Sequence, residues 1–357
     1  MKRIVGSVIV CLLVIPYAYG QEPGDDCVLV KVVDCGQGLC CVVQAPGEKY
    51  MIYDCGVNSE NAMRGIRELI GDEGTVDLLV ISHTDKDHIM AAKAICDDYD
   101  VTEVVRLGDR TKGKFIDPLE KAIRDERKEN KCKDIDLARR KGANIDGTQF
   151  PLGPATVTVL SGYGKLPKDW LEKIKGNDSE LRNAGSIVVR LTYKGHSVLF
   201  CGDEMGRHLG EDDGDPILAE KHMIESSDKE GRRLESDVMI APHHGSDSGS
   251  TTAFIKAVKP KYVIFSAGHS SNYHHPSAVA AKRYEDAGIK VTNMFRTDLG
   301  DNEGAKEWSF GRAVIKKDTI GDDDIDIILP AHGDVQVGYA QEKSQDQHDK
   351  AAAIWRN

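Results

Sequence analysis

The sequence predicts an α/β fold, and three features of the chain carry that prediction. Apolar runs of strand length alternate with stretches of helical spacing, as residues 78–81 alternate with residues 63–70. Glycine turns join the first strands into antiparallel hairpins. Polar residues follow several apolar runs directly, as His83 closely follows residues 78–81. That placement is typical of proteins whose chemistry lies at the carboxyl ends of their strands.

The elements of the first half follow from turn residues and apolar spacing. Strands at 27–33 and 39–44 flank a glycine turn at 34–38, and a turn at 46–48 leads into a strand at 50–53. The other predicted elements of this half are a helix at 63–70, a strand at 78–81, a helix at 90–96, a strand at 101–107 and a hairpin at 148–161.

The second half repeats this order of strands and helices. Strands at 186–193 and 197–200 meet at a tight turn around Gly195. The elements predicted after them are a strand at 237–241, a helix at 251–258, a strand at 262–266, a helix at 277–287 and a strand at 291–295. Residues 308–316 and 325–329 are expected to complete a sheet.

The chain is predicted to hold one domain behind an export signal. Lys2 and Arg3 precede the apolar run 4–15, and the small residues Ala18 and Gly20 form a cleavage site. An uncleaved membrane anchor is the competing interpretation, but the run is shorter than the roughly 20 apolar residues that span a bilayer. The predicted parts are a signal peptide at 1–20, a spacer at 21–26, a folded domain at 27–338 and a polar tail at 339–357. The mature chain is therefore expected to be secreted or periplasmic, without a membrane span.

Charge and composition limit the partners. The chain has 357 residues, of which 40% are hydrophobic and 29% charged, and a net charge of −11. An acidic surface argues against indiscriminate binding to nucleic acid or anionic membranes. Residues 106–147 are predicted to form a helical, basic excursion, with 13 Lys or Arg against 8 Asp or Glu between 106 and 141. A solvated face is favoured there over a nucleic-acid groove, since Phe115 is the only aromatic side chain available for stacking.

The cysteines leave two interpretations open. One of the nine lies in the predicted signal peptide, and the other eight give an even count that permits disulfides in an exported chain. Several of them lie in strand-like apolar runs, where free buried thiols are equally ordinary. Their spacing matches no zinc-finger pattern.

A metal site is the main functional prediction. The strand at 78–81 is followed by His83, Asp85, Asp87 and His88, four potential metal ligands within six residues. A solvated acidic loop with incidental histidines is the alternative. More potential ligands follow other strand-like runs, namely Asp54, Asp203, His243, His244 and His275. One pocket with two divalent ions, a bridging carboxylate and a bridging water explains this mixture, because such a pair lowers the pKa of water and yields hydroxide near neutral pH.

The motifs resemble those of metallo-β-lactamase-fold hydrolases, specifically the exported domain type of the ComEC/Rec2 competence proteins. The motifs that carry the resemblance are Val33-Asp34-Cys35-Gly36-Gln37-Gly38, Tyr53-Asp54-Cys55-Gly56, Ser82-His83-Thr84-Asp85-Lys86-Asp87-His88, Asn183-Ala184-Gly185-Ser186, Cys201-Gly202-Asp203, Pro242-His243-His244-Gly245-Ser246 and Asn272-Tyr273-His274-His275-Pro276-Ser277. The resemblance implies an αββα sandwich of two mixed β-sheets flanked by helices. It gives this chain no membrane channel of the kind that the full competence protein has.

The resemblance also implies how the ligands are divided between the two ions. His83 and Asp85 would hold the first ion, and Asp87 and His88 the second. Asp203 would bridge the ions. His243 would complete the shell of the second ion, with His244 as the competitor for that role.

Two further residues receive roles from the resemblance. Asp54 would lie beneath the site and orient a ligand, and His275 would act as a proton donor or oxyanion stabiliser that titrates near neutrality. The wider superfamily has His where this chain has Asp85, which admits manganese or magnesium besides zinc. Between His88 and Asp203 the first ion lacks an evident third protein ligand.

The resulting functional prediction is an exported metal-dependent hydrolase, most plausibly a phosphodiesterase or nuclease that uses a metal-bound hydroxide on nucleic acid. The first alternative keeps the two ions but hydrolyses an ester, a lactone or a choline-phosphate ester. A non-catalytic binding protein ranks last, because the chain keeps most of the ligands.

Overall fold

The computed structural model describes residues 26–108, 114–139, 145–174, 176, 178–211, 213–229, 232–268, 272–300, 307–308 and 320–355. The predicted signal peptide and nearly all of the predicted spacer lie outside these residues. Most of the strand predicted at 308–316 lies outside them as well. Within the described part of the chain, no helix is both long enough and apolar enough to cross a membrane.

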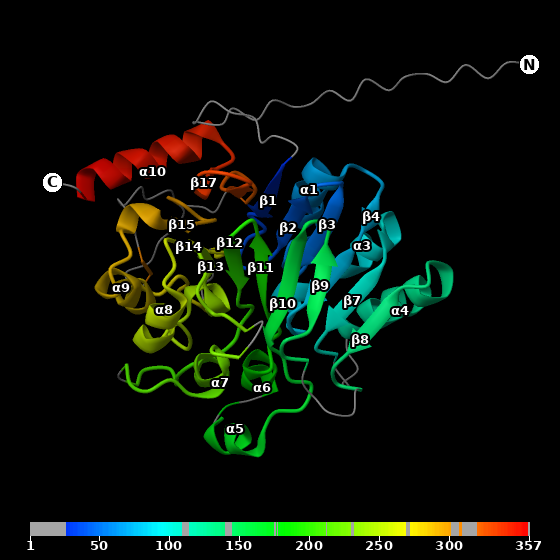
Figure 1. Cartoon of the computed structure of the whole chain (residues 1–357), viewed down its shortest axis with the longest axis horizontal. Helices are drawn as coiled ribbons and strands as arrows, with labels where there is room; N and C mark the ends of the chain where they lie inside the picture. Colours follow the sequence, from blue (N-terminus) through cyan, green and yellow to red (C-terminus); the bar gives the residue numbers. More distant parts are fainter. Residues whose placement is uncertain are drawn as a thin grey trace, which may run out of the picture.

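Two mixed β-sheets face each other, and helices cover their outer faces (Figure 1). The first sheet has the strand order β17 (Gln336–Tyr339), β16 (Ile325–Pro330), β1 (Cys27–Val32), β2 (Cys41–Ala45), β3 (Lys49–Tyr53), β5 (Leu78–Ile81), β7 (Glu103–Arg106) and β8 (Lys133–Asp136). The second has the order β15 (Met294–Arg296), β14 (Tyr262–Phe265), β13 (Val238–Ile240), β12 (His196–Phe200), β11 (Val188–Tyr193), β10 (Ala155–Ser161) and β9 (Gln149–Leu152). The short strands β4 (Thr75–Val76) and β6 (Asp100–Val101) pair separately.

Alternation along the strands divides the core into layers. In β5, Leu78 and Val80 pack between the two sheets, whereas Leu79 and Ile81 face the helices. Side chains of successive strand residues point to opposite faces, so a run without polar residues is what a strand buried on both sides requires. The predicted central strand therefore lies at the middle of the sandwich.

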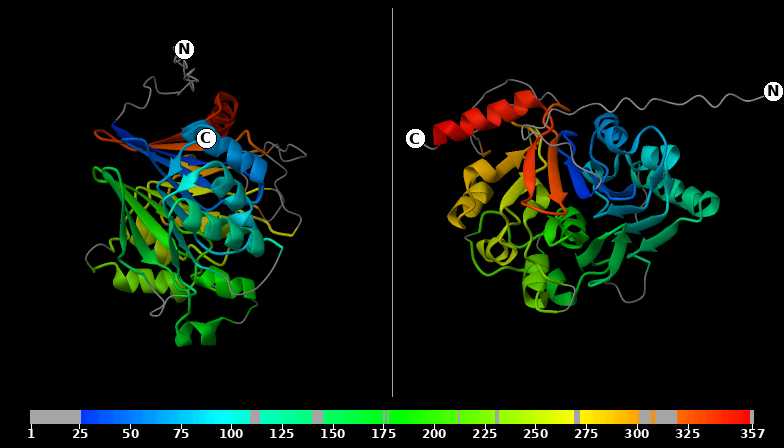
Figure 2. Two further views of the ribbon diagram at one scale, coloured as in Figure 1. Left: turned by 90° about the vertical axis from the view of Figure 1, so that its right-hand side faces the viewer. Right: turned by 45° about the horizontal axis from the view of Figure 1, so that its top comes forward.

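Helices cover the outer face of each sheet. Helices α1 (Ser59–Ile70), α3 (Ala92–Asp98) and α4 (Ile116–Glu129) contribute to the core cluster outside the first sheet, and α7 (Leu218–Ser226), α8 (Thr252–Val258) and α9 (Ala278–Asp286) to that outside the second. The predicted αββα sandwich of two mixed sheets is confirmed. Helices α5 (Lys168–Lys173) and α10 (Glu342–Trp355) lie at opposite ends of the molecule, as Figures 1 and 2 show.

The segment at 106–147 differs from the exposed helical excursion that its charge suggested. Its helix α4 buries Leu119 and Ile123, one turn apart on a single face, and the strand β8 extends the first sheet. Arg106 is buried and paired with Glu120 and Asp134. Within the described part of this segment, Arg106 is thus neutralised by carboxylates of the same segment. This pairing argues against a nucleic-acid groove there.

Two other local predictions need adjustment. The helix expected at 90–96 is α3, which begins at Ala92 and ends at Asp98, and the short helix α2 (Lys86–Ile89) precedes it. The polar tail contains the long helix α10. The seven cysteines after Cys27 are buried free thiols, and Cys27 itself is half-buried. The question left open by the even count is resolved in favour of buried thiols.

Candidate metal centre

Strand ends from both sheets bring the predicted ligands together. In the first sheet, β3 ends just before Asp54, and β5 leads into the loop and the short helix α2 that carry His83 and His88. In the second sheet, β12 leads to Asp203 and β13 to His244. Parallel strands end at the same edge of a sheet, so both halves deliver polar side chains to one place.

Gly202 permits the close approach between the two halves. Its φ is +55°, and a Cβ at this position would lie 2.7 Å from Cβ of Ser82. Any other residue there would have a disfavoured backbone conformation, and its Cβ would collide with Ser82. Glycine thus lets the end of β12 pack directly on the loop after β5, which brings Asp203 beside His83 and His88.

The histidine pair after β13 adopts an unusual backbone. His243 and His244 both lie in the left-handed region, with φ of +49° and +57°. Nε2 of His244 lies 3.5 Å from Oδ2 of Asp87 and 3.3 Å from Nε2 of His88. Nε2 of His243 instead lies 3.6 Å from Oδ2 of Asp203. The structure thus places His244, the competitor in the sequence-based assignment, beside Asp87 and His88.

All four central imidazoles share one orientation. In each of them Nδ1 contacts an outer oxygen, which turns Nε2 toward the centre. These contacts are His83 with Oγ of Ser82 at 3.0 Å, His88 with Oδ2 of Asp54 at 2.8 Å, His243 with Oγ of Ser248 at 2.8 Å and His244 with the carbonyl of Ser266 at 2.7 Å. Outer contacts of this kind fix the tautomer and orientation of metal-ligating histidines.

Asp54 is the central outer residue of this set. It is fully buried, and its carboxyl also accepts the backbone N–H of Ser82 and the Ser82 hydroxyl, each at 2.7 Å. Asp54 therefore contacts His88 rather than the pocket, and its role as a positioning residue stays a prediction.

Two groups of side chains in the described residues have the arrangement of a metal site. They are His83 with His88 and Asp203, and Asp87 with His88 and His244. Within each group the ligand atoms lie within 4.8 Å of one another. Nε2 of His83 is buried without a hydrogen-bond partner in the described structure. Buried polar atoms normally have a partner, and a bound cation would provide one here. This set of imidazole and carboxylate atoms fits divalent cations.

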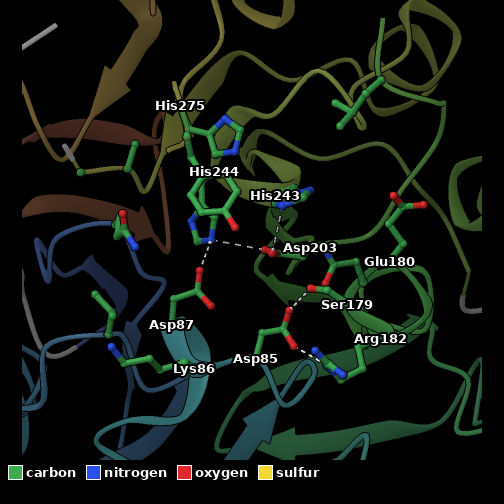
Figure 3. Close-up of a pocket in the computed structure, with 17 residues that line it drawn as sticks. Asp85, Lys86, Asp87, Ser179, Glu180, Arg182, Asp203, His243, His244 and His275 are labelled. Atoms are coloured by element: carbon green, nitrogen blue, oxygen red, sulfur yellow. Dashed lines mark hydrogen bonds and ion pairs between the residues drawn. The ribbon is translucent and has the colours of Figure 1, made fainter. Parts of the chain in front are cut away.

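Asp85 lies outside both groups. Its nearest approach to His83 is 3.8 Å, between Oδ2 and Nε2. Its carboxyl is bonded to the guanidinium of Arg182 and to the hydroxyl of Ser179 (Figure 3). The structure therefore brings Asp85 to the rim of the centre and gives it partners that sequence reasoning did not identify.

The electrostatics of the centre favour bound cations. Burial alone would raise the pKa of Asp203, but surrounding imidazoles, His88 foremost, hold that pKa well below its usual range. For His88, burial lowers the pKa, yet the charges of Asp203 and Asp54 outweigh it and raise that pKa well above its ordinary value. A cation at Nε2 of His88 must displace a proton, so the affinity for the cation should rise with pH.

His275 does not titrate near neutrality, which corrects the expectation from the sequence. Burial, and then the nearby imidazoles of His243 and His244, lower the pKa of His275 to about 3. The ring is neutral at physiological pH and cannot act as an imidazolium acid. Its Nδ1 is buried without a hydrogen-bond partner in the described structure. A neutral imidazole can still donate one hydrogen bond to a developing negative oxygen.

A pocket opens at the centre. It has a volume of about 520 Å³, within the range of roughly 300–1,000 Å³ that is common for ligand sites. Figure 3 shows that His243, His244 and His275 approach it from one side, whereas Asp85 and Asp87 approach from the other. The lining residues that sequence reasoning did not include in the site include Arg182, Leu209 and Tyr273.

A buried carboxyl supports the loop after the histidine pair and gives a pH-dependent prediction. Glu220 accepts the backbone N–H of Thr251 at 3.1 Å and its hydroxyl. Burial raises the pKa of Glu220 from 4.5 to about 7. The folded protein thus keeps a proton that the unfolded chain releases, and this stabilisation, present below pH 4.5, is lost as pH rises through 7.

We expect Glu220→Gln to remove that loss, because the amide carries no ionisable proton. Relative to wild type, the free energy of unfolding of the variant should increase by about 2 kcal/mol between about pH 5 and about pH 8. Urea titrations at several pH values measure this. Glu225→Gln, on the exposed side of the same helix, is the matched control and should follow wild type. Parallel curves for Glu220→Gln and wild type would contradict the assignment.

The fold and the site together define a class of protein, the metal-dependent hydrolases with an αββα sandwich. The model of the metallo-β-lactamase superfamily matches residues 33–269, and the chain belongs to that superfamily. The predicted family and the predicted class of enzyme are thereby confirmed.

Two curated relatives are competence proteins. Competence protein ComA of Neisseria gonorrhoeae is 32% identical over 134 residues, which cover 38% of this chain and 16% of that protein. ComE operon protein 3 of Bacillus subtilis (strain 168) is 23% identical over 290 residues, which cover 75% of this chain and 32% of that protein. The chain therefore spans a third or less of the length of these two relatives.

Solved structures of the same fold are more distant. The metallo-β-lactamase fold protein YhfI from Bacillus subtilis has a TM-score of 0.43 and 13% identity, covering 75% of this chain and 95% of that one. MEM-A1, a subclass B3 metallo-β-lactamase from a soil metagenome library, has a TM-score of 0.36 and 15% identity. The match covers 63% of this chain and 81% of that one.

Proposed function

We propose that the protein is a metal-dependent phosphodiesterase that cleaves single-stranded nucleic acid. The observation that carries the proposal is an exposed aromatic side chain beside the metal centre. Tyr273 is 59% exposed, lines the pocket, and stacks on His275 with ring centroids 5.9 Å apart and an interplanar angle of 24°. Leu209, another lining residue, is 65% exposed. Exposed aromatic faces of this kind stack unpaired bases without sequence preference.

A single strand fits this surface better than a duplex. Among the described residues of the segment at 106–139, several basic side chains are paired with carboxylates, as Arg106 is with Asp134, and the whole chain carries a net charge of −11. A long duplex would therefore meet net electrostatic repulsion. The similarity to two competence proteins also supports a nucleic-acid substrate.

The ligand set names which residues would hold the ions. Asp87, His88 and His244 form one group, and Asp203 lies against it with Oδ1 at 3.1 Å from Nε2 of His88. Bound divalent ions supply Lewis-acid stabilisation of phosphoryl oxygens and lower the pKa of water. A mixture of imidazole and carboxylate donors suits zinc or manganese, with magnesium a weaker candidate.

The protein's own residues then bind and orient the substrate. Asp54 fixes the ring of His88 through Nδ1. His275, neutral at physiological pH, presents a ring N–H to the phosphoryl group and stabilises charge as it develops. Tyr273 holds the base next to the cleaved bond, so that the phosphate lies over the ligand cluster.

Cleavage assays on a labelled single-stranded oligonucleotide with Mn²⁺, Zn²⁺ or Mg²⁺ test this proposal. We expect cleavage with at least one of these ions and none in EDTA. A panel of carboxylic esters, lactones and choline-phosphate esters tests the alternative substrates. Hydrolysis of that panel without cleavage of the oligonucleotide would overturn the nuclease assignment.

The stacking role of Tyr273 gives a specific prediction. Tyr273→Ala should raise KM for the oligonucleotide about tenfold, because base stacking on an aromatic side chain contributes about 1–3 kcal/mol. Tyr273→Phe keeps the ring and should behave as wild type. An abasic oligonucleotide of equal length keeps the phosphates but has no bases, so its KM should not change in either variant. An equal loss on both oligonucleotides would show that Tyr273 supports the centre rather than the base.

A further inference from the structure

The pairing of Asp85 distinguishes the two sides of the metal centre. Asp85 directly precedes α2, and its partners Arg182 and Ser179 both belong to α6 (Asp178–Ala184). The side chains of Arg182 and Asp85 are 30% and 16% exposed, so this ion pair lies at the pocket wall rather than in free solvent. The carboxyl that would complete the His83 side is therefore already engaged by a positive charge.

The two candidate ligand groups compete for one atom. Both include His88, but Nδ1 of that ring is bonded to Asp54. Only Nε2 of His88 is left, and it can bind a single ion. If one group binds an ion through this atom, the other group is left with two of its three ligands.

The balance favours the side that contains Asp87. There Asp87 and His244 complete the group with His88, and Oδ1 of Asp203 lies 3.6 Å from Nε2 of His244. On the other side, Oδ2 of Asp203 lies 3.8 Å from Nε2 of His83 and 3.6 Å from Nε2 of His243, and Asp85 is the one carboxylate that this side would not share. An ion on the His83 side would have to draw Asp85 away from Arg182.

We propose that Arg182 is a built-in positive charge that competes for Asp85 with a divalent ion on the His83 side, so that the protein binds one ion tightly and another only weakly. The tight position is that of Asp87, His88, His244 and Asp203, and the weak one is that of His83, Asp85 and Asp203. Like-charge repulsion and the loss of a ligand both act against the ion in the weak position. This inference concerns metal binding and does not depend on which substrate is hydrolysed.

Titration of the EDTA-treated protein with Mn²⁺ alone tests the proposal, with free Mn²⁺ followed by electron paramagnetic resonance. Wild type should bind one equivalent tightly and a second at least about tenfold more weakly. In Arg182→Gln the second equivalent should tighten about fivefold, because a partly exposed ion pair contributes up to about 1 kcal/mol. The first equivalent should change little.

Three further variants separate the charge from other effects. Arg182→Lys keeps the positive charge and should leave the second ion weak. In Asp85→Asn the additional change Arg182→Gln should give no gain, because the contested carboxyl is gone. The control is Arg67→Gln on α1, which removes a surface ion pair with Asp98 of α3. This variant should titrate as wild type. Equal affinity of wild type for two ions, or an unchanged second equivalent in Arg182→Gln, would overturn the proposal, whether or not the protein cleaves nucleic acid.

Discussion

Asp87→Ala is expected to lower kcat/KM for cleavage of a single-stranded oligonucleotide by about 10³-fold. Asp87 contributes a carboxylate to the group that it forms with His88 and His244, where its Oδ2 lies 3.5 Å from Nε2 of His244. Its removal takes a negative ligand from the tight position, and effects on this scale follow when charge stabilisation in a transition state is lost.

The measurement pairs a cleavage assay with the metal content of the same preparation. Asp97→Ala is the control, because Asp97 is exposed on α3 and bonded only to Lys93 in the described structure. Full activity is expected from that variant. Cleavage by Asp87→Ala at the wild-type rate, with metal retained, would remove this residue from the site.

Asp54→Asn is expected to weaken binding of the first Mn²⁺ equivalent by about 10–100-fold, the range found for residues that orient metal ligands. Oδ2 of Asp54 accepts the hydroxyl of Ser82 and faces Nδ1 of His88. An amide nitrogen at that position cannot accept these hydrogens, so His88 would lose its fixed tautomer.

Ser82→Ala provides the comparison for Asp54→Asn. It removes one hydroxyl from the Asp54 carboxyl but leaves the contact with His88, and its effect on Mn²⁺ affinity should be smaller. Mn²⁺ titration of both variants distinguishes a positioning role from a general loss of stability. Unchanged affinity in Asp54→Asn would mean that packing alone holds the imidazole.

The local pattern around the strand at 78–81 was sufficient to predict where the chemistry lies. In α/β proteins the residues directly after a buried strand leave the sheet at its carboxyl edge, where ligands bind. Potential ligands in that position are therefore expected to form a site there. Asp54 and Asp203 could be placed for the same reason, since each follows a strand of one of the two sheets.

Two features of the site depended on information that the sequence pattern does not hold. Arg182 meets Asp85 across 97 positions, and no local spacing predicts that contact. The choice between His243 and His244 depends on left-handed backbone at both residues, which L-amino acids rarely adopt and which propensity therefore does not anticipate.

The segment at 106–147 shows a different kind of limit. Leu119 and Ile123 were too few to predict a core face on their own. In the structure α4 needs only a narrow stripe, because it packs on α3 at the edge of the sandwich. For His275, burial by distant parts of the chain sets the pKa, and composition carries no signal for it.

The origin of the ligands has a consequence for how the molecule opens. Asp87 and His88 follow β5 of the first sheet, whereas Asp203 and His244 follow β12 and β13 of the second. An ion bound to all four cross-links the two sheets at their shared edge. A bound ion stabilises only the state that binds it, so it would suppress any fluctuation that separates the two sheets. The amides of β5 and β12 should then exchange with solvent together.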